Sequence, residues 1–153
     1  MKDTKQAFLW IVRKLNENDI RFRISGGMAA RVYGSSRPLA DIDIEIPDEG
    51  LDKVLPSVKE HIIERPHRYK DNEWDIYYMV LEYMGQRIEL SGAESQMVFD
   101  KDKKQWIHMG IGLKSVLKEV FGIKVPVIPR SELIGYKSMI RREVDLIDIK
   151  NIS

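Results

Sequence analysis

Residues 26–45 read GGMAARVYGSSRPLADIDIE, and the two ends of this stretch decide how the chain is interpreted. At the C-terminal end, apolar and acidic side chains alternate through residues 41–46, DIDIEI. Alternation with a period of two is typical of a β-strand whose two faces differ. The three isoleucines therefore point into the core, and the opposite face carries Asp41, Asp43 and Glu45.

The acidic face of this strand needs an explanation, because like charges at alternate positions repel one another. One explanation is solvent, since a half-exposed strand can carry acids on its wet side. The other is a divalent cation, and oxygen ligands without sulfur or clustered histidine suit Mg²⁺ or Mn²⁺ better than zinc. An EF-hand loop is excluded, because the sixth position counted from Asp41 is Ile46, where that loop needs glycine.

The N-terminal end of the stretch is a glycine pair between two predicted elements. Residues 20–24 alternate as a strand does, and residues 28–34 predict a short helix. A tight turn that needs positive φ explains Gly26 and Gly27. Alternatively, the missing side chains let a phosphate approach the backbone amides at a helix N-terminus, where the dipole favours an anion. Both readings stay open at this point.

The composition predicts one globular domain over residues 1–153, with 43% hydrophobic and 32% charged residues. The net charge is only +1, so duplex DNA is not expected as a partner. The chain has no cysteine, which excludes thiolate catalysis and Cys-type zinc sites and fits a reducing cytoplasm. No apolar run reaches the roughly 20 residues of a membrane span, and the N-terminus does not resemble a signal peptide. We therefore expect a cytoplasmic protein that acts without a membrane.

Patterns elsewhere in the chain predict the remaining elements. We expect helices over residues 7–15, 48–58, 113–121 and 131–150, and strands over residues 61–65, 74–84, 87–90, 105–111 and 125–128. The strands over 74–84 and 87–90 form a hairpin. Residues 37–40 and 66–72 are expected as loops. The aromatic residues of the hairpin suit either core packing or a ring-stacking surface.

Taken together, the glycine pair and the acidic strand resemble the nucleotidyltransferase superfamily, the fold of DNA polymerase β. Its signature is a strand, a Gly-Gly or Gly-Ser pair that opens a helix, and, some residues later, a strand that bears D-x-D or D-x-E. Here Ser25-Gly26-Gly27 is followed by Asp41-Ile42-Asp43. The match is closest to minimal, antibiotic-adenylyltransferase and toxin-type members, in which Ala29 and Arg37 also have counterparts. Those members carry Ser or Thr where this chain has Leu39.

The resemblance implies an α+β fold, with helices packed on a mixed, mostly antiparallel sheet. It also implies a third carboxylate on a neighbouring strand, and Glu89 in Arg87–Leu90 occupies the expected place. Glu45 is the competitor. We prefer Glu89, because Glu45 lies two strand steps, roughly 13 Å, beyond Asp41.

The predicted C-terminal helix carries Lys137, Arg141, Asp145 and Asp148 on a flank beside its apolar stripe. Spacings of four, four and three suit a ladder of salt bridges on a solvated flank. The resemblance offers another reading, in which Lys137 faces the nucleotide phosphates.

The implied function is transfer of a nucleoside monophosphate from a nucleoside triphosphate to a hydroxyl, with two Mg²⁺ or Mn²⁺ ions as cofactors. Asp41, Asp43 and Glu89 would bind the metals, and Glu89 would help to deprotonate the acceptor. Ser25, Gly26 and Gly27 would cradle the phosphates, and Arg37 or Lys137 would neutralise their charge. The acceptor could be a small molecule, a protein side chain or an RNA end. The alternative is a non-catalytic nucleotide- or metal-binding module of the same fold, regulatory or part of a toxin–antitoxin pair.

Overall fold

A computed structural model describes residues 1–153 and shows a single sheet of nine strands with helices on both faces. The strand order is β7-β6-β4-β5-β2-β1-β9-β8, and β3 pairs with β4 outside this path. The strands are β1 (Arg23–Ser25), β2 (Asp41–Ile46), β3 (Ile62–Lys70), β4 (Trp74–Tyr83), β5 (Gln86–Gly92), β6 (Met97–Asp100), β7 (Gln105–His108), β8 (Val116–Val120) and β9 (Ile123–Val127). Only β2–β5 and β1–β9 are parallel pairs. The predicted α+β class with a mixed, mostly antiparallel sheet is confirmed.

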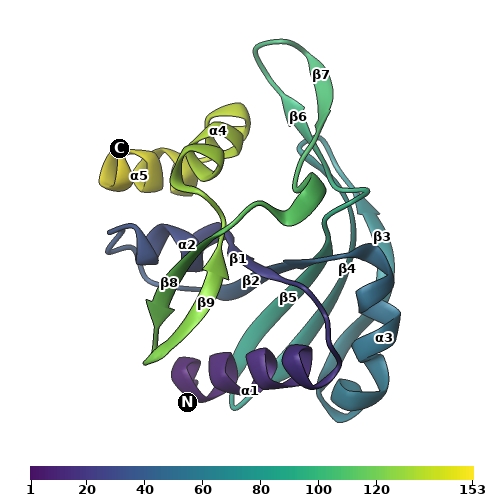
Figure 1. The fold of residues 1–153 in the computed structure, drawn as a ribbon. Coiled ribbons are helices and arrows are strands. Elements are labelled where there is room, and N and C mark those ends of the chain that lie inside the picture. The colour runs from purple at the N-terminus through teal and green to yellow at the C-terminus, as the bar shows by residue number, and fades with distance from the viewer.

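Five α-helices accompany the sheet (Figure 1): α1 (Thr4–Glu17), α2 (Gly26–Val32), α3 (Asp48–Val58), α4 (Arg130–Ile140) and α5 (Glu143–Ile152). Two 3₁₀ turns, Lys59–His61 and Ile111–Leu113, complete the secondary structure. No helix is long and apolar enough to cross a membrane.

The isoleucines of β2 are fully buried, as the alternation predicted. They contact the layer formed by α1 and α3, where Gly50 of α3 lies against Ile46. The helices α2, α4 and α5 contact one another and form a second group (Figure 1). Residues of α2 and α4 lie on the acidic face of β2. The sheet thus has an apolar face under α1 and α3, and a polar face that remains partly open.

The prediction of one continuous helix over residues 131–150 is wrong. Helix α4 ends at Ile140, Arg141 adopts a left-handed conformation with φ 54° and ψ 41°, and α5 begins at Glu143. The break lets α5 turn back so that Asp145 and Asp148 reach Lys137 of α4. As a result the apolar stripe is interrupted, and Ile147, expected in the core, is 41% exposed.

The helix predicted over residues 113–121 is also wrong, because most of this segment is strand β8. It forms a hairpin with β9 through Phe121 and Gly122, whose φ values of 51° and 84° are those of a type I′ turn. Strand β9 lies inside the sheet, between β1 and β8.

Strand β3 extends through much of the predicted loop at residues 66–72, with its pairing irregular between Glu64 and His67, where Pro66 lies. Strand β7 stops at His108, short of the predicted end. The hairpin of β4 and β5 is confirmed, and its turn is again of type I′, at Met84 and Gly85.

Candidate active site

A cleft of about 500 Å³ opens on the polar face of the sheet, between the start of α2, strands β2, β5 and β4, and helices α4 and α5. It is lined by all eight residues to which the resemblance gave a role in the site: Ser25, Gly26, Gly27, Arg37, Asp41, Asp43, Glu89 and Lys137. No sequence pattern pointed to several other residues that line the cleft, including Tyr69, Asp71, Glu73, Tyr136 and Arg142.

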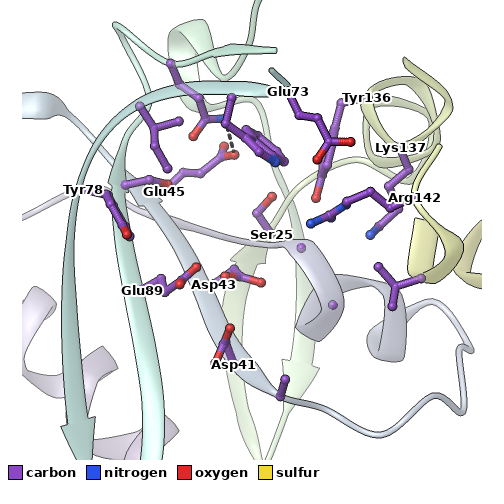
Figure 2. A pocket seen from close by; sticks show the side chains of 18 of the residues that line it. Ser25, Asp41, Asp43, Glu45, Glu73, Tyr78, Glu89, Tyr136, Lys137 and Arg142 are labelled. Atoms are coloured by element: carbon purple, nitrogen blue, oxygen red, sulfur yellow. Dashed lines mark hydrogen bonds between the residues drawn. The ribbon is translucent and has the colours of Figure 1, made fainter. Parts of the chain in front are cut away.

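The parallel pairing of β2 and β5 brings three acids together. Asp43 stands directly opposite Glu89 in the register, and Asp41 lies two residues earlier on the same face of β2. Figure 2 shows the side chains of Asp43 and Glu89 next to each other on the cleft floor, with Asp41 on the same side. This proximity depends on the pairing of β5 with β2, and β5 is the neighbouring strand on which the resemblance implied a third carboxylate.

Burial raises the pKa of Asp43 well above its ordinary value, and the negative charges of Glu89 and Asp41 raise it further. The amide of Gly27 only partly offsets this rise. Burial also raises the pKa of Asp41, with Glu89 again contributing. The floor of the cleft therefore carries more negative charge than its protein surroundings compensate.

Arg87 supplies part of the missing positive charge. Its guanidinium lies 3.2 Å from a Glu89 carboxylate oxygen and 3.6 Å from Asp41, and it also approaches Glu64 at 3.7 Å. The side chain is 43% exposed, so these contacts are screened by solvent.

The donor chemistry of the three carboxylates fits a hard divalent cation, because only oxygens converge and no sulfur or imidazole competes. As placed here, however, no three His, Asp or Glu side chains form a group with the geometry of a metal site.

The glycine pair is constrained by its contacts with neighbouring side chains. Gly26 has a φ of +57°, and a Cβ there would lie 2.1 Å from an oxygen of Asp43. A Cβ on Gly27 would lie 2.8 Å from the guanidinium of Arg37. Both glycines therefore allow a polar side chain of the cleft to approach the backbone, and Gly26 also needs the left-handed conformation.

Lys137 is 2% exposed and lies 3.1 Å from Asp145 and 3.0 Å from Asp148. Asp148 also binds Arg37 through two parallel hydrogen bonds of 3.0 and 2.9 Å. Burial opposes ionisation of Asp148, but hydrogen bonds from Arg37 and Lys137 lower its pKa overall. These residues therefore do not form a solvated ladder, one of the two readings of the sequence; Lys137, Asp145, Asp148 and Arg37 form a buried network that joins α4, α5 and the loop before β2. Arg141 is not part of it and pairs with Asp102 instead.

Arg142 is a cation that the sequence analysis missed. It hydrogen-bonds to Asp145 at 2.8 Å and lies over the ring of Trp74 at 6.0 Å, yet its side chain stays 42% exposed. Lys137, Arg37 and Arg142 therefore all border the same side of the cleft, and Arg142 is the most exposed of the three.

Glu45, the competing third carboxylate, is engaged elsewhere. It accepts a hydrogen bond of 2.6 Å from the fully buried Arg23 and another of 3.2 Å from Gln96. Arg23 also pairs with Glu132 at the start of α4. Glu45 is thus part of a buried ion pair that docks α4 on the sheet.

Some aromatic residues of β4 pack in the core and others line the cleft, so both uses that the sequence allowed occur. Tyr83 stacks on Trp10 with ring centroids 4.4 Å apart, and Tyr77 packs against the core. Trp74 and Tyr78 line the cleft. None of the three histidines lines the cleft; His61 contacts Trp10, and His67 contacts Tyr78.

No family model and no curated protein sequence matches the chain. Among solved structures, a Thermotoga maritima protein described as a nucleotidyltransferase superposes with a TM-score of 0.69 at 18% identity, over 94% of this chain and 91% of that one. The lincosamide antibiotic adenylyltransferase LnuA, solved with lincomycin bound, gives a TM-score of 0.65 at 14% identity, over 99% and 98% of the two chains. The antibiotic-resistance factor ANT(2'')-Ia gives 0.56 at 14% identity, over 87% and 69%. The chain therefore has the nucleotidyltransferase fold.

Proposed function

We propose that this chain is a nucleotidyltransferase that transfers a nucleoside monophosphate from a nucleoside triphosphate to an acceptor hydroxyl. The observation that carries the proposal is the pairing of Asp43 with Glu89 on the floor of a cleft that also contains the glycine pair. Two acids from different strands, with the pKa of one strongly raised, are typical of a functional site rather than of a solvated surface.

Asp41, Asp43 and Glu89 would hold Mg²⁺ or Mn²⁺, which supplies positive charge to the oxygens on both sides of the transferred phosphorus. Their surplus negative charge supports this assignment. The open backbone at Gly26 and Gly27 binds the β- and γ-phosphates, together with Ser25. Arg37 and Arg142 offset the phosphate charge from the opposite side.

Glu89 accepts the proton of the acceptor hydroxyl while the oxygen of that hydroxyl bonds to the α-phosphorus. The bond from that phosphorus to the bridging oxygen breaks, and pyrophosphate leaves. Lys137 is a positioning residue here, since its ammonium group is enclosed by Asp145 and Asp148. It holds α5 so that Arg142 reaches the cleft.

One argument for the alternative, a non-catalytic binding module, is that 153 residues leave little room for an acceptor-binding domain. The match to LnuA weakens that objection, because an adenylyltransferase of nearly the same extent is covered over 98% of its length. Since LnuA is a lincosamide antibiotic adenylyltransferase and ANT(2'')-Ia is an antibiotic-resistance factor, a small-molecule acceptor is the first class to test.

The test is pyrophosphate release from ATP, CTP, GTP and UTP with Mg²⁺, measured against small-molecule, protein and RNA fractions of a cell extract. We expect one fraction to become labelled by an α-³²P nucleotide, and Glu89→Gln to abolish the labelling while the far-UV circular dichroism is unchanged. Nucleotide binding without label in any fraction would favour the non-catalytic module. Absence of nucleotide binding would refute the proposal.

A further inference from the structure

We propose that two copies of this chain associate through the outer face of helix α5, in an antiparallel contact with two-fold symmetry. We define this face as the outer α5 stripe, which consists of Glu143, Leu146, Ile147 and Lys150. The proposal goes beyond the proposed function and does not depend on it.

Helix α5 buries two acids and exposes two aliphatic side chains. A surface helix normally does the reverse, with its apolar stripe toward the core and its charged residues toward solvent. Asp145 and Asp148 are fully buried, where they contact Lys137. Leu146 is 52% exposed and Ile147 is 41% exposed, and neither of them packs against the hydrophobic core. Adjacent apolar residues on the outer side of a helix that is polar inside indicate an interaction surface.

The outer α5 stripe is continuous along the helix. Its members are separated by three, one and three residues, so they are neighbours on one side of α5. At about 100° per residue, the centre of this side lies roughly 180° from the side that carries Asp145 and Asp148. Figure 1 shows α5 at the margin of the molecule, with α2 and α4 beside it. A partner can therefore reach the stripe without displacing another element.

The charges of the stripe make it complementary to itself. Glu143 lies three residues before Leu146, and Lys150 lies three residues after Ile147. When two copies of α5 run antiparallel, Glu143 of each copy meets Lys150 of the other, and the aliphatic pairs meet between these charges. The two helix dipoles are then also opposed, which is favourable. A parallel contact would place like charges against each other, so charge selects the antiparallel arrangement.

The composition and the size of the stripe favour a weak dimer over other occupants. A helix that binds a membrane surface carries several Lys or Arg residues beside its apolar face. This stripe has one Lys and one Glu, which together are neutral. Four residues are far fewer than the roughly 20–30 that each partner contributes to a standard interface. We therefore expect a reversible dimer with a dissociation constant in the range of about 10–500 μM.

The first experiment measures dimerisation of the full chain by sedimentation velocity at low ionic strength and without nucleotide. We expect a shift from monomer to dimer as the concentration rises through the micromolar range. Leu146→Asp places two charges at the centre of the contact and should raise the dissociation constant at least about tenfold. Leu117→Asp is the matched control, since Leu117 is a 69% exposed leucine on β8, and it should leave the dissociation constant within about twofold. Far-UV circular dichroism should be unchanged in both variants.

A charge exchange tests the antiparallel arrangement. Glu143→Lys and Lys150→Glu each replace attraction with repulsion at both ends of the contact, so each should raise the dissociation constant by about three- to tenfold. The double variant restores opposite charges at both ends and should bind within about twofold of wild type. Added salt should remove these differences but should leave the effect of Leu146→Asp.

Three outcomes would overturn the proposal. One is a chain that sediments as a monomer over the whole concentration range. Another is a dimer that Leu146→Asp leaves intact or that Leu117→Asp weakens equally, because the contact would then lie elsewhere. The third is a dimer that Leu146→Asp disrupts but the charge exchange does not affect, which would contradict the antiparallel pairing of Glu143 with Lys150.

Discussion

Replacing Asp43 with asparagine tests the electrostatics of the cleft floor in two opposite directions. The folded state raises the pKa of Asp43 through burial and through the charges of Glu89 and Asp41. An acid whose pKa is raised by folding destabilises the fold once pH exceeds its unfolded pKa, and the penalty grows until pH passes the folded pKa. At neutral pH the ionised carboxylate therefore reduces stability, and Asp43→Asn removes the penalty.

Relief of the repulsion between Asp43 and two neighbouring carboxylates sets the scale of the change. A gain in unfolding free energy on the order of 1 kcal/mol is expected, which for a chain of this length raises Tm by roughly 2–4 °C. The same change should reduce Mg²⁺-dependent transfer at least about 100-fold, because a charge that stabilises the transition state is lost.

The assay pairs thermal unfolding at pH 7 and pH 4 with pyrophosphate release. The gain in stability should be present at pH 7 and should shrink at pH 4, because the penalty exists only above the unfolded pKa and grows with pH. Leu117→Asn, at an exposed site on β8, is a control for a neutral surface change. A variant that is less stable than wild type at pH 7 and retains the full transfer rate would refute the reasoning.

Three further perturbations follow from the structure. Gly26→Ala places a Cβ 2.1 Å from a carboxylate oxygen of Asp43 at a φ of +57°. We expect the free energy of unfolding in urea to fall by about 1–3 kcal/mol and nucleotide binding to weaken. The control is Gly122→Ala, with φ +84° and no neighbouring atom, which should show the backbone strain without the binding defect. Lys137→Met leaves two buried aspartates without their shared cation and should lower the free energy of unfolding by about 3–5 kcal/mol. Arg141→Ala removes an exposed ion pair and should lower it by less than about 1 kcal/mol. Equal losses in chemical denaturation would contradict the buried network. Because folding lowers the pKa of Asp148, the ionised carboxylate stabilises the fold above the unfolded pKa, and this stabilisation is lost as pH falls through the folded pKa. Asp148→Asn should therefore make stability depend less on pH in the acid range. An unchanged pH dependence would argue against a stabilising role of the Asp148 carboxylate.

Strand β2 and the loop before it could be predicted from the sequence, because the patterns that specify them are local. The period of two in β2 buried the isoleucines as expected, and the loop at residues 37–40 delivers the chain into the strand. The resemblance added Glu89, and the pairing of β2 with β5 then placed it opposite Asp43. Neither composition nor periodicity could have supplied that register.

The errors occurred where tertiary contacts overrode local patterns. The apolar and charged periodicity after Ser131 suits one long helix, yet the buried aspartates require a bend that Arg141 provides at a positive φ. Residues 116–120 have a helix-compatible composition, but pairing with β9 made them a strand. Arg142 was missed for the same reason, since only the bend turns it toward the cleft.

The most direct test of the account is a crystal structure with Mn²⁺ and a non-hydrolysable nucleoside triphosphate, with data collected for the anomalous signal of manganese. We predict anomalous peaks bounded by oxygens of Asp41, Asp43 and Glu89, with the phosphates against Gly26 and Gly27. Nucleotide bound in the cleft with no manganese at these carboxylates, or with manganese held elsewhere, would contradict the claim that the acidic strand exists to bind cations.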